Sequence, residues 1–148
     1  MSMEPHVCWQ GELTFDRSQL EGALAALGFA STGLHDFHEA DGFWPVDIAG
    51  CKTGVEIYLE NDLEALREDY PELASALGGR DKGATFRWGG DAAECATGLA
   101  LAAALARLGD VVIYEPSEGV SYSETRAADE ARNMFEVAEK EGFRGRES

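Results

Sequence analysis

Positive charge is scarce in this sequence. The 148 residues include 12 lysines and arginines against 28 aspartates and glutamates, so the formal net charge at pH 7 is −16. Nucleic acids are bound through Lys and Arg side chains that neutralise phosphates, and anionic membranes attract the same residues. Neither is therefore an expected partner, whereas a basic protein would be attracted and its encounter accelerated.

Cysteines are also few. Cys8, Cys51 and Cys95 are an odd number at wide spacing with no CxxC pair, which excludes a disulfide framework. The stretch MSMEPHVCWQ lacks the basic and apolar regions of a secretory signal. The longest apolar run, residues 96–106, is shorter than the ~20 residues of a membrane span. These absences predict a cytoplasmic protein whose thiols act as small core side chains.

No complete metal-binding motif is present, although LHDFHEADGFWP (residues 34–45) concentrates reactive side chains. His35 and His38 stand three apart among Asp36, Glu39 and Asp41. Imidazoles and carboxylates can together ligate a transition metal, but two histidines without a fixed third ligand are a weak pattern. Because the stretch lacks an apolar period, we expect a solvated acidic loop that holds no metal and no cofactor.

A second stretch, RWGGDAAEC (residues 87–95), runs from a predicted strand into a predicted helix. The Gly89-Gly90 turn before a helix N-terminus resembles an anion cradle. However, the sequence contains neither GxGxxG nor GxxxxGK[ST], and Asp91 occupies the place of the anion, so we interpret Asp91 as the N-cap. Cys95 lies one turn inside the helix, too deep for strong activation by the helix dipole.

Hydrophobic periodicity predicts nine elements in the order β-α-β-β-α-β-α-β-α. Ser18 with Glu21 forms a predicted capping box, Asn61 a predicted cap, and Pro71 is expected to split its helix. The apolar segment 96–105 should be a buried central helix. The predicted strands cover residues 7–15, 43–50, 54–60, 84–90 and 110–116, and the predicted helices cover 18–28, 61–79, 91–109 and 123–143.

This order predicts an α+β fold in a single domain over residues 1–148, with 144–148 as a disordered tail. We expect one mixed, mostly antiparallel sheet with helices packed on it. The first six elements match a ferredoxin-like split βαβ arrangement. The segment from Ala84 to Pro116 has room for a right-handed crossover between parallel strands.

The negative charge is distributed unevenly. Residues 36–81 contain twelve acids and three bases, a net charge of −9. Aromatic side chains among charges of one sign are typical of a protein-docking face. The residues predicted to bind a partner are Asp36, Glu39, Asp41, Trp44, Asp47, Tyr58, Glu60 and Asp62.

Two phrases, GFWPVDIAGCKTGVEIYLE and FRWGGDAAECATGLALAAALARLGDVVIYEPSEG, together carry a resemblance. They resemble a group of small uncharacterised acidic bacterial α/β proteins with an FWP…GxE hairpin and an RWGGDxxEC helix. By size and charge the chain also looks like the immunity proteins of bacterial toxin systems. The resemblance implies no established catalytic residues.

The leading hypothesis is therefore a non-catalytic immunity or inhibitor protein that neutralises a basic partner such as a bacterial toxin. The alternative is a small-molecule or metal-dependent enzyme that uses the His35/His38 loop or the Gly89-Gly90 turn. The sequence favours the first, because it offers no complete set of nucleophile, base and orienting group and no set of three metal ligands.

Overall fold

Seven strands form one sheet in the computed structural model, which describes residues 5–88 and 91–141. The strand order is β2-β3-β4-β5-β1-β6-β7, and every pair between described strands is antiparallel. The strands are β1 (His6–Trp9), β2 (Ser31–Thr32), β3 (Asp41–Ile48), β4 (Cys51–Glu60), β5 (Lys82–Arg87), β6 (Val112–Glu115) and β7 (Val120–Tyr122). The predicted α+β fold is confirmed. The sheet was predicted to be mixed and mostly antiparallel, and the strand pairs within the described residues are all antiparallel.

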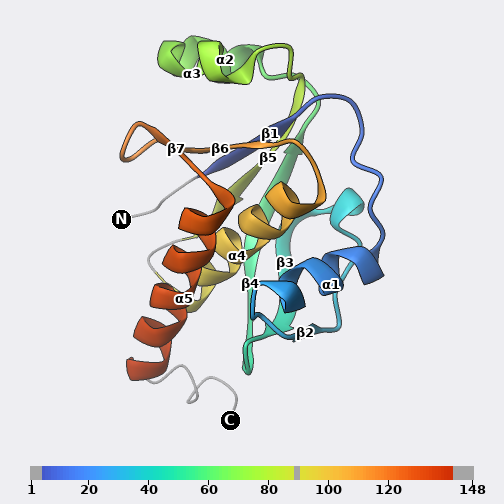
Figure 1. Cartoon of the computed structure of the whole chain (residues 1–148), viewed down its shortest axis with the longest axis vertical. Helices are drawn as coiled ribbons and strands as arrows, with labels where there is room; N and C mark the ends of the chain where they lie inside the picture. Colours follow the sequence, from blue (N-terminus) through green and yellow to red (C-terminus); the bar gives the residue numbers. More distant parts are fainter. Residues whose placement is uncertain (1–4, 89–90, 142–148) are drawn as a thin grey trace.

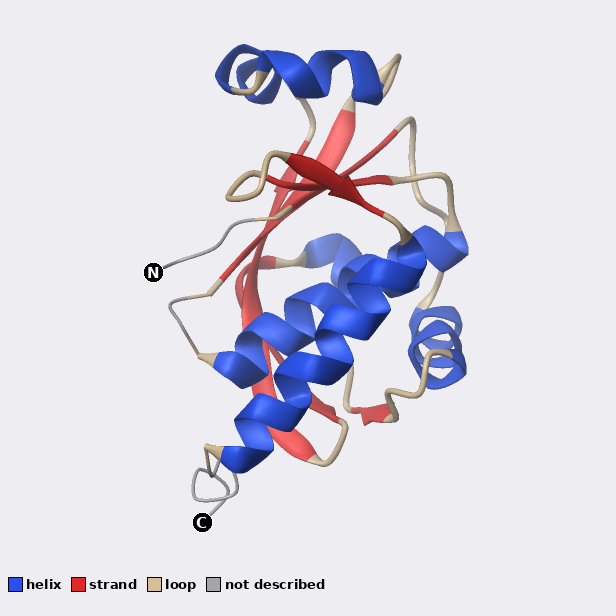
Figure 2. Ribbon diagram, turned by 60° about the vertical axis from the view of Figure 1, so that its left-hand side comes forward, coloured by secondary structure: helices blue, strands red, loops and turns tan. Residues whose placement is uncertain are grey.

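The helices cover the two faces of the sheet unequally (Figures 1 and 2). One face packs against α4, which α1 and α5 flank, and the opposite face is covered only at one end, by α2 and α3. We call the first the inner face and the second the outer face. The helices are α1 (Arg17–Ala26), the 3₁₀ turn η1 (Phe37–Glu39), α2 (Glu64–Asp69), α3 (Pro71–Leu77), α4 (Ala92–Leu108) and α5 (Glu124–Lys140).

A ferredoxin-like arrangement is present, but in elements other than the predicted ones. The succession β1-α1-β4-β5-α4-β6 has its strands side by side in the order β4-β5-β1-β6. Each helix thus joins two parallel strands that are separated by an antiparallel one, which is the split βαβ motif. The prediction used the first six elements and was wrong there. β2 and β3 extend the edge of the sheet, and α2 and α3 are inserted between β4 and β5.

Several element boundaries differ from the prediction. β1 ends at Trp9 instead of continuing to Phe15, because Gly11 turns the chain with a positive φ of 71°. The N-cap of α1 is Asp16, two residues before the predicted cap Ser18, and the helix begins at Arg17. Its capping box is formed by Asp16 and Gln19, because these side chains already satisfy each other's backbone N–H groups.

The β3–β4 hairpin turns at Ala49-Gly50, two residues before the predicted turn at residues 51–53. Both turn residues have positive φ, 52° and 78°, which is the conformation of a two-residue hairpin turn whose twist matches that of the strands. The short strands β2 and β7 were missed, since two or three residues are too few to show a period.

The central helix is confirmed. In α4 all residues from Cys95 to Leu105 are buried, and Asp91 is its N-cap, accepting hydrogen bonds from the backbone N–H groups of Ala93 and Glu94 at 2.9 and 3.2 Å. The break at Pro71 is confirmed too, whereas the predicted Asn61 cap is wrong. α2 starts after Leu63 and its first backbone N–H donates to the Asp62 carboxylate. Within the described residues no helix has the length and apolar character needed to cross a bilayer.

Candidate partner-binding face and cavities at His38

The outer face of β3 and β4 is open beyond the end covered by α2 and α3. Alternate residues of β3 project from it, and Phe43 is the most exposed large apolar side chain there, with 58% of its surface accessible. Its ring lies across the backbone of β4, because a Cβ placed on Gly54 would come within 2.5 Å of the ring. An aromatic ring is therefore presented on a rigid strand instead of a loop.

Polar side chains surround Phe43 on the neighbouring strands. Tyr58 donates a hydrogen bond of 2.6 Å to Glu56, and this bond is the main cause of the raised pKa of Tyr58. Glu56 stands opposite Arg87 of β5, and Asp47 stands opposite Lys52. Opposite charges at paired positions offset each other. The uncompensated negative charge of this face thus gathers at the Asp41 end of the hairpin.

Four of the eight predicted partner-binding residues project from the outer face: Asp41 and Tyr58 as a cross-strand pair, Asp47 near the hairpin turn, and Glu60 at the other end of β4. Glu39 lies in η1, and Asp36 is its N-cap, so both precede Asp41 closely along the chain. Asp62 lies between β4 and α2, where its carboxylate accepts the Glu64 backbone N–H.

Trp44 is the exception, and its prediction as a partner-binding residue is corrected. Its side chain is only 3% exposed and belongs to the inner-face core. Successive side chains of a strand point to opposite faces, so burial of Trp44 and Val46 places Phe43 and Pro45 outside. Phe43, Pro45, Glu56 and Arg87 were missed. The alternation of β3 was the signal that could have found Phe43.

Two consecutive hydrogen bonds join His6, Thr85 and Glu60 on the covered part of the outer face. The His6 Nδ1 atom lies 2.9 Å from the Thr85 hydroxyl oxygen, and that hydroxyl donates to a Glu60 carboxylate oxygen at 3.2 Å. The Tyr70 ring lies 5.9 Å from the His6 ring. Glu60 is thus held in place on the outer face by a neighbour that sequence reasoning did not identify.

The two histidines of the predicted loop have different surroundings. His38 Nε2 lies 2.8 Å from the Phe15 carbonyl oxygen, and because a carbonyl only accepts, Nε2 carries the proton. The His38 ring also lies on the Phe15 ring, with centroids 4.6 Å apart. Both His35 and His38 are exposed. In the neutral form of His38, Nδ1 is the ring nitrogen that can accept a hydrogen bond, because Nε2 is engaged with the Phe15 carbonyl.

Two adjoining cavities meet at His38. One, of about 340 Å³, is lined by both histidines together with Phe15, Leu20 and Phe37 among others. The second, of about 430 Å³, shares His38, Phe15 and Phe37 with the first and extends to β4 and β5. In residues 5–88 and 91–141 no three His, Cys, Asp or Glu side chains are grouped to hold a metal ion. Both cavities thus share the rings of Phe15, Phe37 and His38.

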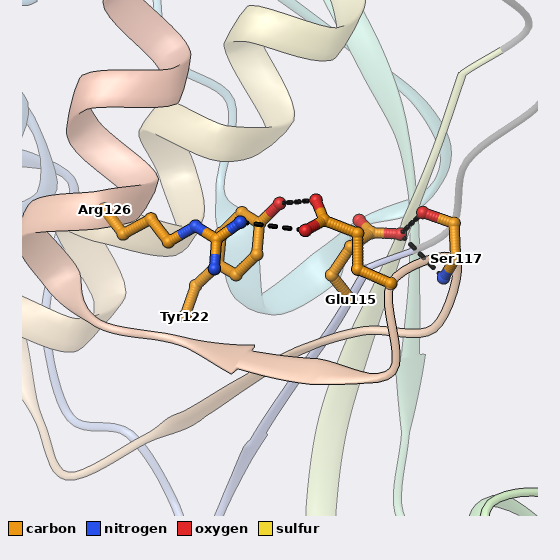
Figure 3. A network of polar contacts seen from close by, with 5 residues as sticks. Glu115, Ser117, Tyr122 and Arg126 are labelled. Atoms are coloured by element: carbon orange, nitrogen blue, oxygen red, sulfur yellow. Dashed lines mark hydrogen bonds and ion pairs between the residues drawn. The ribbon is translucent and has the colours of Figure 1, made fainter.

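A further polar network ties the β6–β7 hairpin to α5 (Figure 3). Glu115 is buried, only 1% exposed, and accepts hydrogen bonds from the backbone N–H and the hydroxyl of Ser117 at 3.1 and 2.6 Å. Tyr122 donates to Glu118, and Arg126 both bonds Glu118 at 2.8 Å and lies 4.1 Å over the Tyr122 ring. Because these polar groups are hydrogen-bonded to one another, we interpret the network as stabilising the conformation of the β6–β7 hairpin.

The other predicted reactive groups do not form a site. Burial is the main cause that raises the pKa of Cys8 and of Cys95 to about 12, so both thiols are protonated and inert near neutral pH. Cys51 is buried as well. The Gly89-Gly90 turn lies outside the described residues, as does the predicted disordered tail at 144–148.

Comparisons of the chain with protein family models, with curated proteins and with solved structures found no match. The resemblance to small acidic bacterial proteins therefore stays a prediction. The function is argued below from the surfaces of the molecule.

Proposed function

We propose that this protein is a non-catalytic binding module that docks a basic partner protein on the outer face of β3 and β4, as an immunity or inhibitor protein of a bacterial toxin would. The observation that carries the proposal is the exposure of Phe43 on the uncovered part of a rigid sheet. Buried aromatic anchors dominate the energy of many protein interfaces, and large apolar side chains exposed on a flat rigid surface are candidates for that role.

The acidic residues around Phe43 support a basic partner. Asp41 stands two residues before Phe43 on the same face of β3, and Asp36 and Glu39 lie just before Asp41 in the chain. Together with a net charge of −16 these carboxylates produce a field that attracts cationic proteins. We define the acidic rim as Asp36, Glu39 and Asp41. A partner such as a nuclease would place the basic residues of its active site against this rim and would receive Phe43 in an apolar pocket. Its active site would then be covered.

The first experiment tests the anchor. A basic binding partner would be captured from the source cell and identified by mass spectrometry, and its affinity measured with purified proteins. Phe43→Ser should weaken binding at least tenfold, which corresponds to about 1.4 kcal/mol. Val137→Ser on α5 is the matched control, because Val137 is also an exposed apolar side chain, 37% accessible, on a distant element. Equal effects of the two changes would contradict the proposed face.

The second experiment tests the charge. Replacing Asp36, Glu39 and Asp41 by their amides should lower the association rate, and the loss should shrink as salt reduces the Debye length from ~10 Å to ~3 Å. The same number of acids replaced on the last helix and just after it, at Glu136, Glu139 and Glu141, is the control. An association rate indifferent to salt and to the first triple change would exclude electrostatic docking at this rim.

A further inference from the structure

The larger of the two cavities at His38 is a mixed apolar and charged chamber on the inner face of the sheet. It lies where β1 ends, β5 begins and β4 ends, beside the segment 12–15 and η1. Its volume of about 430 Å³ is within the ~300–1,000 Å³ of small-molecule sites. The site is separate from the outer face proposed above for a protein partner.

Apolar side chains form much of the wall. Trp9 and Phe15 belong to the core, and Leu13 and Leu59 are packed against the core but keep part of their surface accessible. Half-exposed leucines beside buried aromatic rings leave apolar surface in contact with water. An apolar group that entered the cavity would release that water, a gain of about 25 cal/mol for each Å² of apolar surface covered.

One basic and two acidic side chains, Lys82, Glu12 and Glu60, line the same cavity. Lys82 of β5 is half-buried and Glu12 is exposed, and neither side chain has a hydrogen bond or ion pair with another described residue. Lys82 stands opposite Trp9 in the β1–β5 pair, so its side chain emerges on the inner face. Glu60 also borders the cavity, but its carboxylate is bonded to Thr85 on the outer face. Lys82 is therefore the ammonium group of the lining, and Glu12 is the carboxylate that makes no hydrogen bond with another described residue.

His38 adds an oriented acceptor. Its Nε2 proton is held by the Phe15 carbonyl at 2.8 Å, so in the neutral form of the ring Nδ1 is the nitrogen that can accept a hydrogen bond. The ring is fixed by its contact with Phe15. His38 and Glu12 both belong to the lining, so it includes two residues that can accept a hydrogen bond from a ligand N–H group.

We propose that this cavity binds a zwitterionic amino acid with an apolar side chain. Its carboxylate pairs with Lys82, its ammonium group with Glu12 and His38 Nδ1, and its side chain covers Leu13, Leu59 and Trp9. A zwitterion carries one group of each sign, and the lining offers Lys82 to its carboxylate and Glu12 to its ammonium group. It also avoids the repulsion that a simple anion meets from a chain of charge −16.

Three probes that share a phenyl ring test the ligand class: L-phenylalanine, 3-phenylpropanoate, which lacks the ammonium group, and phenethylamine, which lacks the carboxylate. Binding would be measured by calorimetry and by NMR shifts of the Trp9 indole and His38 ring signals. L-Phenylalanine should bind at least tenfold more tightly than either single-charge probe. Absence of binding by L-phenylalanine, or equal binding of 3-phenylpropanoate or of phenethylamine, would overturn the assignment.

Variants locate the site. Lys82→Met keeps the aliphatic stem and removes the charge, and should weaken L-phenylalanine binding at least tenfold. Lys52→Met, an exposed lysine on the β3–β4 hairpin, is the matched control and should leave the affinity unchanged. Glu12→Gln provides a second test on a surface residue that the fold tolerates. Unchanged L-phenylalanine affinity in both site variants would refute the proposal. Phe43→Ser should leave the affinity for L-phenylalanine unchanged, although it weakens binding of the protein partner.

Discussion

A hydrogen bond from Tyr114 of β6 links the outer face of the sheet to α3. Its hydroxyl donates to Glu72 at the start of α3, and its ring packs with Tyr70, centroids 5.3 Å apart. The bond to Glu72 is the main cause that raises the pKa of Tyr114 to about 12. The same bond lowers the pKa of Glu72. One residue pair therefore links the stability of the inserted helices to pH.

The sign of this pH dependence follows from the raised pKa of the tyrosine. The neutral hydroxyl stabilises the fold below the ordinary tyrosine pKa near ~10, and this contribution disappears as the pH rises through the folded value of about 12. Tyr114→Phe should therefore lower the melting temperature at pH 7, and the difference from the parent should vanish toward pH 12. Circular dichroism melts across this range provide the measurement.

Tyr70→Phe is the control for this prediction, because among the described residues the Tyr70 hydroxyl has no hydrogen-bond partner. At pH 7 it should lower the melting temperature less than Tyr114→Phe does, because only the Tyr114 hydroxyl is bonded to Glu72. A Tyr114→Phe variant that melts like the parent at pH 7 would show that the bond to Glu72 does not hold α3 in place.

At the scale of elements, the fit of α4 against the sheet depends on a glycine. Gly98 lies in the middle of the buried helix, where a glycine is normally unfavourable by up to ~1 kcal/mol relative to alanine. A Cβ on Gly98 would lie 2.6 Å from a ring carbon of buried Trp88 and 3.5 Å from the Phe86 Cβ. The missing side chain thus lets the helix approach the aromatic layer above β5.

Two glycine substitutions in helices should consequently have opposite effects. Gly98→Ala should destabilise the protein, because overpacking a filled core costs ~1–3 kcal/mol, more than the gain in helix propensity. Gly22→Ala in α1 should stabilise it by ~0.5–1 kcal/mol, since nothing lies within 4 Å of the added Cβ. Urea unfolding of both variants measures the two free energies. Stabilisation by Gly98→Ala would mean that α4 stands farther from Trp88.

The net charge of the whole molecule destabilises the folded state. Folding gathers 28 acids and only 12 lysines and arginines into a small volume, so like charges repel. Several bases are already paired, among them Arg80 with Asp110 at 2.8 Å and Arg107 with Glu124 at 3.2 Å. Exposed pairs of this kind contribute little, and they leave most of the negative charge uncompensated.

Salt should therefore stabilise this protein. Raising sodium chloride from ~0.01 M to ~0.1 M shortens the Debye length from ~30 Å to ~10 Å and screens the repulsion, so the melting temperature should rise. Differential scanning calorimetry at fixed pH measures the change. The same concentration of a neutral sugar is the control, and should produce a smaller rise. A melting temperature that falls with salt would indicate that attractive pairs outweigh the repulsion.

Much of the local structure could be predicted from the amino-acid order. The 3.6-residue and two-residue periods located every long helix and strand, Asp91 was identified as a cap, and the Pro71 break was predicted. These features depend on interactions between residues a few positions apart, such as a side chain bonding the N–H of the next turn. The buried character of α4 was equally visible, because a helix that is apolar all round has no face for water.

The order of the strands and the site were decided only by tertiary contacts. Whether β5 or β4 lies beside β1 depends on pairing between segments far apart in the chain, and no local period records it. The same pairing placed Trp44 in the core and Phe43 on the outer face, so Trp44 does not lie on the surface where it was predicted. The cavity at His38 likewise exists because residues from β1, β4, β5 and η1 converge, and convergence in space is a property of the folded chain.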